Sequence, residues 1–283
     1  MPVRLVTDST SYIDQPTREK LGISVVNLRV NFPDESFAET SVPYDYFYDK
    51  MERENLIPTS SQPAPGDFYN IFKEIVARGE EVLGIFISAQ MSGTHDSALR
   101  AKKLVLEKYP RARIEILDSK TNCMALGLQV IEAAIAAQAG KRMEEVMEAA
   151  RNIADKVQFY FVPASLKYLQ KGGRIGGASA LIGSLLKIRP ILYVNNGITD
   201  LLEKVRGTRS AVKRMTEVLN QEVKMRGLRH LLVHHINDEH AGKDLAACLG
   251  REYGREVASF PIGPVIGLHV GPGTVGIVFC TET

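Results

Sequence analysis

The chain has 283 residues, which is enough for one large domain or two domains of modest size. Hydrophobic residues make up 45% and charged residues 24% of it, as in globular proteins with a sizeable core, and a formal net charge of +2 gives no strong field for nucleic acid. The three cysteines, Cys123, Cys248 and Cys280, lie too far apart for a CxxC metal site and do not suggest a disulfide framework.

The first half of the chain alternates strand and helix patterns. Strand patterns cover residues 3–7, 23–30, 82–88 and 114–118. Helix patterns cover residues 15–21, 44–53, 67–78, 95–109, 123–139 and 143–156. This alternation predicts a mostly parallel sheet covered on both faces, in which ligands bind beyond the carboxyl ends of the strands.

The second half has a different pattern, with more consecutive strands. Strands are predicted at residues 158–162, 189–195, 198–205, 228–236, 256–261 and 276–280. Helices are predicted at residues 165–170, 180–186 and 210–225. Asn196-Gly197 is a strong hairpin signal. We therefore predict an α/β fold in which an α/β domain, residues 1–160, precedes an α+β domain with an antiparallel sheet, residues 161–283.

Two hydroxyl-rich loops each precede a helix pattern. The first loop, residues 58–66, reads PTSSQPAPG, and the second, residues 88–94, reads SAQMSGT and follows an apolar strand. Unpaired N–H groups and a partial positive charge at a helix N-terminus attract anions, and Ser and Thr hydroxyls add donors there. Converging loops would form a pocket for a carboxylate or a phosphate. Ordinary helix capping is the alternative for either loop.

Three other patterns give weaker signals. Residues 271–276 match GxGxxG, but a strand pattern follows instead of a helix, so we reject a dinucleotide site. The histidines between residues 230 and 240 lack the spacing of metal ligands, and we predict no metal site. His269, beside the glycine-rich turn, is either structural or a donor to a bound anion. A hydrolase that uses Ser92 and His269 stays as an alternative, although the serine is not in a GxSxG motif.

These motifs together resemble those of the DegV family of bacterial fatty-acid-binding proteins. The resemblance runs from Val6-Thr7-Asp8-Ser9 to the turn at residues 271–273. The TSQPS-type loop of the family appears at residues 60–64, with Ser60 in place of Thr and Ala64 in place of Ser. The SGLSGT-type loop appears at residues 88–94, with Ala89 and Gln90 as departures. The LxYLKKGGRI and HxGPG motifs appear at residues 166–175 and 269–273.

The resemblance implies a two-domain fold and a long-chain fatty acid as ligand. The residues that it places at the carboxylate are Ser60, Ser61, Ser92, Gly93, Thr94 and His269. The first-loop donor is open among Thr59, Ser60 and Ser61. Arg174 and Arg206 match basic positions near the mouth of the site, although basic residues there also fit a solvated face. Residues that could line the acyl chain, or simply form core, are Leu181, Ile182, Leu185, Leu186 and Ile191.

The family's biology implies a binding role without catalytic residues or a cofactor. Burial stabilises each methylene by about 0.8 kcal/mol, so about fourteen of them supply roughly 11 kcal/mol before entropy costs. In several bacteria, family members present the fatty acid to a separate kinase subunit, which makes acyl phosphate. We expect that role here, in the cytoplasm, without nucleic acid and with transient membrane-surface contact left open. The alternatives are a stand-alone enzyme acting on a small anion and a lipid carrier without a kinase.

Overall fold

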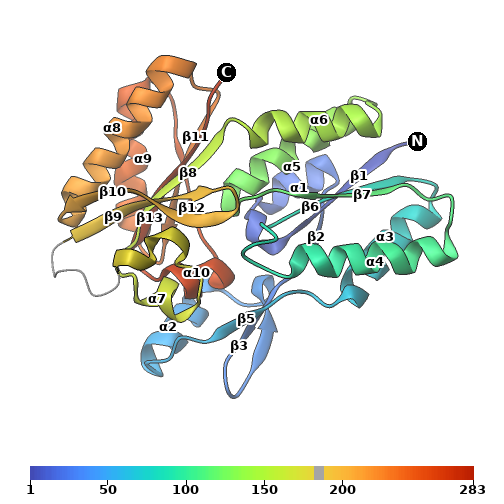
Figure 1. Ribbon diagram of the computed structural model, residues 1–283, viewed down its shortest axis with the longest axis horizontal. Coiled ribbons are helices and arrows are strands. Elements are labelled where there is room, and N and C mark those ends of the chain that lie inside the picture. The colour runs from blue at the N-terminus through green and yellow to red at the C-terminus, as the bar shows by residue number, and fades with distance from the viewer. Residues whose placement is uncertain (182–187) are drawn as a thin grey trace. The chain divides into compact units, whose positions relative to one another are not determined.

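The computed structural model describes residues 1–181 and 188–283, so the predictions for Ile182, Leu185 and Leu186 lie outside the described residues. Contacts divide the chain into two compact units, whose course Figure 1 traces by colour. Unit 1 contains Met1–Ser41 and Ser60–Asp155, and unit 2 contains Val42–Thr59 and Lys156–Thr283. A segment from the first quarter of the sequence therefore belongs to the unit that holds the C-terminus.

A four-stranded parallel sheet lies at the centre of unit 1. Its order is β2-β1-β6-β7, and the strands are β1 (Val3–Asp8), β2 (Ser24–Val26), β6 (Glu81–Phe86) and β7 (Ile114–Asp118). All six residues of β6 are buried, as in a strand whose sheet is covered on both faces. The predicted parallel sheet is confirmed.

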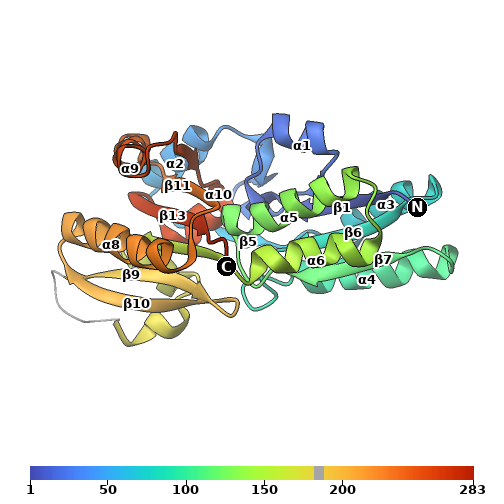
Figure 2. The ribbon, with the colours of Figure 1, turned by 90° about the horizontal axis from the view of Figure 1, so that it is seen from above.

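Five α-helices surround this sheet: α1 (Gln15–Leu21), α3 (Pro65–Ala77), α4 (Thr94–Lys108), α5 (Cys123–Gln138) and α6 (Met143–Ala154). Helix α3 packs against α4, while α5 packs against α1, α6, β1 and β6 (Figure 2). Phe68 and Phe72 of α3 meet Phe86 of β6 in one buried cluster. The apolar stripes of these helices thus supply the core of unit 1.

A small three-stranded sheet in the order β4-β3-β5 is a feature that the sequence pattern did not indicate. It consists of β3 (Arg29–Asn31), β4 (Ser36–Ala38) and β5 (Thr59–Ser61). The apolar run at residues 23–30, predicted as one strand, is split into β2 and β3. Between them the Leu28 N–H donates to Ser9 Oγ (3.1 Å) instead of to a neighbouring strand, and this side-chain bond interrupts the ladder.

Unit 2 is built on a six-stranded sheet in the order β10-β9-β8-β13-β11-β12. The strands are β8 (Val157–Val162), β9 (Ile188–Asn195), β10 (Ile198–Arg206), β11 (His230–Ile236), β12 (Ala258–Pro261) and β13 (Thr274–Cys280). All neighbouring pairs are antiparallel except β11 and β12, which are parallel and are joined by α9 (Glu239–Tyr253). The predicted antiparallel sheet is confirmed, and the parallel pair is an addition.

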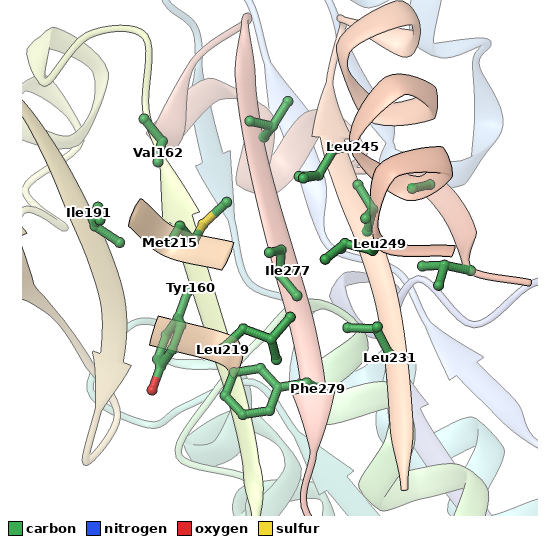
Figure 3. Close-up of a cluster of buried hydrophobic side chains, with 14 of the residues drawn as sticks. Tyr160, Val162, Ile191, Met215, Leu219, Leu231, Leu245, Leu249, Ile277 and Phe279 are labelled. Carbon is green, nitrogen blue, oxygen red and sulfur yellow. The ribbon is translucent and has the colours of Figure 1, made fainter. Parts of the chain in front are cut away.

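The described residues of unit 2 form further α-helices: α2 (Tyr44–Arg53), α7 (Lys167–Lys171), α8 (Thr208–Arg226) and α10 (Pro264–Val270). A short 3-10 helix, η3 (Gly176–Leu181), overlaps the start of the helix predicted at residues 180–186. Figure 3 shows the core, in which Met215 and Leu219 of α8 contact the sheet beside Tyr160, Ile277 and Phe279. Among the described residues, no helix combines the length and the apolar character that crossing a membrane requires.

Candidate functional site

The second hydroxyl-rich loop follows β6 at the carboxyl edge of the parallel sheet, as predicted. Two of its backbone N–H groups tie it to the end of β7 and to the segment that follows. The Ser88 N–H donates to the Thr121 carbonyl (2.9 Å), and the Ala89 N–H donates to Asp118 Oδ1 (3.2 Å). The loop is therefore fixed at the edge where parallel sheets bind ligands.

Helix α4 begins directly at this loop. Its N-cap is Gly93, which has no side chain to cap the helix, while Ser92 Oγ accepts from the Thr94 N–H (3.3 Å) and shares a hydrogen bond with Thr94 Oγ1 (2.8 Å). Thr94 is buried, whereas Ser92 and Gly93 are partly exposed. The Ser92 hydroxyl thus lies at the positive end of a 15-residue helix.

The first hydroxyl-rich loop contains β5, and its serines do not occupy the N-cap of the helix that follows. Helix α3 has Ala64 as N-cap and Pro65 at its start, and Asp67 Oδ2 accepts from the Ala64 N–H (2.9 Å). Ser61 Oγ accepts instead from Asn31 Nδ2 (3.3 Å). Ordinary capping, the alternative for this loop, is therefore wrong.

The structure brings the two loops together. A Cβ on Gly93 would lie 2.5 Å from the side-chain amide of Gln62, so the absence of a side chain at Gly93 leaves room for Gln62 of the first loop to pack on the second. This contact places the Ser60–Ser61 loop beside the Ser92–Thr94 loop within unit 1. Convergence was the condition that the sequence analysis set for a pocket that binds a carboxylate or a phosphate.

Asp8, at the end of β1, supports the second loop from within the protein. Its carboxylate accepts from the Ile87 N–H (2.7 Å), the Thr10 N–H (3.0 Å) and Thr10 Oγ1 (2.5 Å). Complete burial raises its pKa to about 6, although these three hydrogen bonds act in the opposite direction. Ile87 directly precedes Ser88, so Asp8 holds the point where the second loop begins. Sequence reasoning missed this role, although the polar run 7–11 after an apolar strand was a signal.

In unit 2 the LxYLKKGGRI and HxGPG motifs pack against each other. A Cβ on Gly172 would lie 2.2 Å from His269 Nδ1, and a Cβ on Gly271 would lie 2.3 Å from the Tyr168 ring. Arg174 Nη1 donates to the Gly172 carbonyl (2.6 Å). The glycines therefore allow the turn after α7 to lie directly on the end of α10.

His269 lies in the last turn of α10, a helix that the sequence pattern did not indicate. Burial lowers its pKa to about 4, and the positive charge of Arg174 acts in the same direction. The imidazole is therefore neutral near pH 7, with one N–H that can donate a hydrogen bond.

The remaining predicted residues are placed in different parts of unit 2. Arg206 is exposed at the end of β10, where it pairs in register with Ile188. Leu181 ends η3 with 4% of its surface exposed. Ile191 is fully buried in the core cluster of Figure 3, a packing position.

The structure also places the histidines and the glycine-rich turn that gave weaker sequence signals. His234 Nδ1 lies 3.0 Å from the Phe260 carbonyl, while the His235 side chain lies against Gly242 of α9, so the two side chains point to opposite faces of β11. Within residues 1–181 and 188–283, no three His, Cys, Asp or Glu side chains are grouped to hold a metal ion. The glycine-rich turn at 271–273 leads into β13 and not into a helix.

Comparison with known proteins identifies the family. A family model described as "uncharacterised protein, DegV family" matches residues 2–282. A DegV domain-containing protein of Clostridium acetobutylicum is 47% identical over 282 residues, covering 100% of this chain and 99% of that protein.

Two solved structures extend the likeness to the whole fold. A DegV family protein from Thermus thermophilus, described by its fatty acid binding, has a TM-score of 0.89 at 30% identity and covers 99% of this chain and 100% of its own. DegV from Bacillus subtilis, described as a fatty acid binding protein, has a TM-score of 0.87 at 32% identity over 99% of each chain. The chain belongs to the DegV family.

Proposed function

We propose that this protein binds a long-chain fatty acid and holds the carboxylate at the two hydroxyl-rich loops. The observation that carries the proposal is the contact between Gln62 and Gly93, which makes the two loops neighbours at the N-terminus of α4. Hydroxyl donors and a helix N-terminus together suit a carboxylate. The fatty acid binding of the related solved structures supports this choice over a phosphate.

The proposal assigns the carboxylate donors to Ser92 and Thr94 of the second loop and to Ser60 or Ser61 of the first, with the Gly93 backbone beside them. His269, neutral near pH 7, is a further donor in the proposal. Arg174 and Arg206 form a basic rim. Leu181 remains a proposed lining residue for the acyl chain, whereas Ile191 has the position of a core residue.

Mass spectrometry of the ligand released from freshly purified, denatured protein tests the class of ligand. A fatty acid of about 14–18 carbons, in about one copy per chain, is the expected result, since such a chain supplies roughly 0.8 kcal/mol per buried methylene. A polar phosphorylated metabolite in its place would contradict the proposal and favour the small-anion enzyme.

A substitution at the second loop tests the site itself. Ser92→Ala removes one hydroxyl donor, and a hydrogen bond to a charged group contributes about 1.5–3 kcal/mol, so fatty acid affinity should fall about ten- to hundredfold. Ser210→Ala, an exposed serine of α8, is the matched control. Equal affinities of the two variants, measured by displacement of a fluorescent fatty acid, would remove Ser92 from the site.

We further propose that the protein presents the fatty acid to a separate, ATP-using kinase in the cytoplasm and has no catalytic residues of its own. The Ser92 hydroxyl bonds to Thr94, which suits a carboxylate ligand better than a role as nucleophile. Loaded protein with ATP and Mg²⁺ should form no acyl phosphate until a purified fatty acid kinase subunit is added. Turnover by the chain alone would favour the enzyme, and no product even with the kinase would favour a carrier.

A further inference from the structure

Unit 2 contains a cavity of about 540 Å³, whose lining residues all belong to this unit. It opens at the carboxyl ends of the parallel strands β11 and β12, beside the first turns of α9 and α2. In a β-α-β unit, this edge and the helix N-terminus are where ligands bind. The lining side chains are Tyr44, Asp45, Tyr48, His235, Asn237, Glu239, Lys243, Ser259, Pro261 and Ile262.

Two polar groups in this lining have no hydrogen-bond partner among the described residues. His235 is 6% exposed, and both its Nδ1 and the Ser259 hydroxyl are buried atoms that make no hydrogen bond within the described parts of the chain. Both side chains lie against Gly242, where a Cβ would come within 2.7 Å of the imidazole and 2.8 Å of the hydroxyl. Buried polar atoms are nearly always bonded, so a bound molecule is the natural partner of this pair.

The same facts argue against a nucleophilic role for Ser259. A serine nucleophile needs a hydrogen bond to its base, and neither Ser259 Oγ nor His235 Nδ1 has one to the other. Burial also lowers the pKa of His235, which keeps the ring neutral near pH 7. The pair is suited to binding through hydrogen bonds and not to acyl transfer.

The charges of the cavity argue against an anionic ligand. Lys243 Nζ lies 2.6 Å from Glu239 Oε1, so these two charges offset each other. Asp238 caps α9 by accepting from the Ala241 N–H (3.1 Å), which satisfies the positive end of that helix. The exposed Asp45 is the lining charge that remains, and it disfavours anions.

The chemistry of the walls matches a molecule with hydroxyl groups. Imidazole and hydroxyl groups both donate and accept, as a ligand hydroxyl does, and the carboxylates of Asp45 and Glu239 accept from it. Tyr48, Pro261 and Ile262 offer apolar surface for a C–H face, and Tyr48 is held in place because its hydroxyl donates to the Ile262 carbonyl (3.2 Å). We propose that this cavity binds an uncharged polyhydroxyl molecule, of the size of a monosaccharide or a polyol, against His235 and Ser259.

Saturation-transfer NMR with glycerol, D-ribose, D-glucose and myo-inositol tests the proposal on the full chain. At least one of these probes should give a signal, and its dissociation constant should rise at least about fivefold in Ser259→Ala and in Asp45→Asn, since each variant loses one hydrogen-bonding group. Asp49→Asn is the control, because Asp49 is an exposed residue of the same helix α2 that does not line the cavity. This variant should leave the dissociation constant unchanged.

Charged probes decide between ligand classes. Inorganic phosphate should not bind. Phosphate binding that becomes tighter in Asp45→Asn would show that the cavity is an anion site and that the proposal is wrong. Tighter binding of ethanolamine than of any polyol would make it a site for cations and overturn the proposal equally. No signal from any polyol, or one unchanged in both variants, would mean that water alone satisfies His235 and Ser259. Loading with fatty acid is a separate readout, so failure here leaves the first proposal intact.

Discussion

At the residue scale, buried polar side chains of the strands organise both units. Asp8 ends β1 and holds the second hydroxyl-rich loop, and His234 lies in β11 between the Phe159 ring and the Phe260 carbonyl. The serines of the loops were predicted from the sequence because hydroxyl residues after an apolar strand form a local pattern. Asp8, His234 and His235 were not, because their roles depend on burial against segments distant in the chain.

Asp8→Asn should destabilise the protein by about 1–3 kcal/mol, the cost of leaving a buried donor unpaired. An asparagine can accept with one oxygen, but its NH₂ group would then face the Ile87 N–H that now donates to Asp8 Oδ2. Urea unfolding measures the change. Asp96→Asn, an exposed carboxylate in the first turn of α4, should differ from the parent by less than about 0.5 kcal/mol. Equal midpoints for both variants would show that Asp8 is not a structural anchor.

His234 should make the protein less stable in acid. Complete burial lowers its pKa from 6.5 to about 4, so between these values the unfolded chain binds a proton that the folded protein does not. Its stability contribution is therefore full above pH 6.5 and is lost as the pH falls toward 4, by up to about 3 kcal/mol. Asp8, whose pKa is raised, acts in the opposite direction over the same range.

A variant isolates the histidine from the carboxylate. His234→Gln should lose less stability than the parent between pH 6.5 and 4, whatever its stability at pH 7, because the titrating group is gone. His240→Gln, whose parent side chain is 90% exposed, should keep the parental slope. Stability curves from chemical unfolding at several pH values give both slopes. If the stability of the parent and of His234→Gln changed equally with pH, the acid sensitivity would not come from His234.

At the element scale, most helices and strands of both halves were predicted from the sequence, but helices α9 and α10 were not. Helix α9 has buried positions Gly242, Leu245, Ala246 and Leu249 at helical spacing. The helical period was not recognised in the sequence because the segment contains two glycines and follows a histidine-rich stretch. Helix α10 was hidden in the same way, because its glycine and the apolar residues on every side leave no amphipathic stripe.

The turn at residues 271–273 requires glycine for two reasons. Gly271 has φ +95°, and a Cβ there would lie 2.3 Å from the Tyr168 ring. Gly271→Ala should therefore cost of order 1–3 kcal/mol in backbone strain, and displacement of the ring adds to that. Gly254→Ala is the control, because Gly254 has φ +63° with no atom within 4 Å and should cost only about 1–2 kcal/mol.

Unfolding of both glycine variants in urea measures the difference. The two costs should differ by more than the error of the extrapolation, with Gly271→Ala the less stable. If they are equal, the Tyr168 ring moves freely and the contact between α7 and the HxGPG turn does not constrain the site.

At the scale of the whole molecule, the chain does not divide at a single point. The segment Val42–Thr59 belongs to unit 2, although 96 residues of unit 1, Ser60–Asp155, follow it before unit 2 resumes. Composition and periodicity predicted the change from parallel to antiparallel character near residue 160, which lies inside β8. They could not predict that α2 belongs to unit 2, because the local sequence of an amphipathic helix does not indicate which core the helix covers.

Helix α2 is joined to the rest of unit 2 by specific packing. Phe47, Tyr48 and Met51 are each at most 5% exposed, and a Cβ on Gly267 of α10 would lie 2.1 Å from the Tyr48 hydroxyl. Burial of each such side chain stabilises by roughly 1.5–3 kcal/mol, so the three together are comparable with the net stability of a small domain.

Unit 2 should therefore fold on its own only when α2 is supplied. A fragment of residues 156–283, which keeps β8 whole, should bind the dye ANS and melt without a cooperative transition, because the apolar surface under α2 is uncovered. The same fragment with residues 42–59 attached through a Gly/Ser linker should bury that surface and melt cooperatively. A scrambled 42–59 segment on the same linker is the control for added length. A cooperative transition in the bare fragment, equal to that of the fused one, would show that α2 covers a surface that unit 2 does not need to bury.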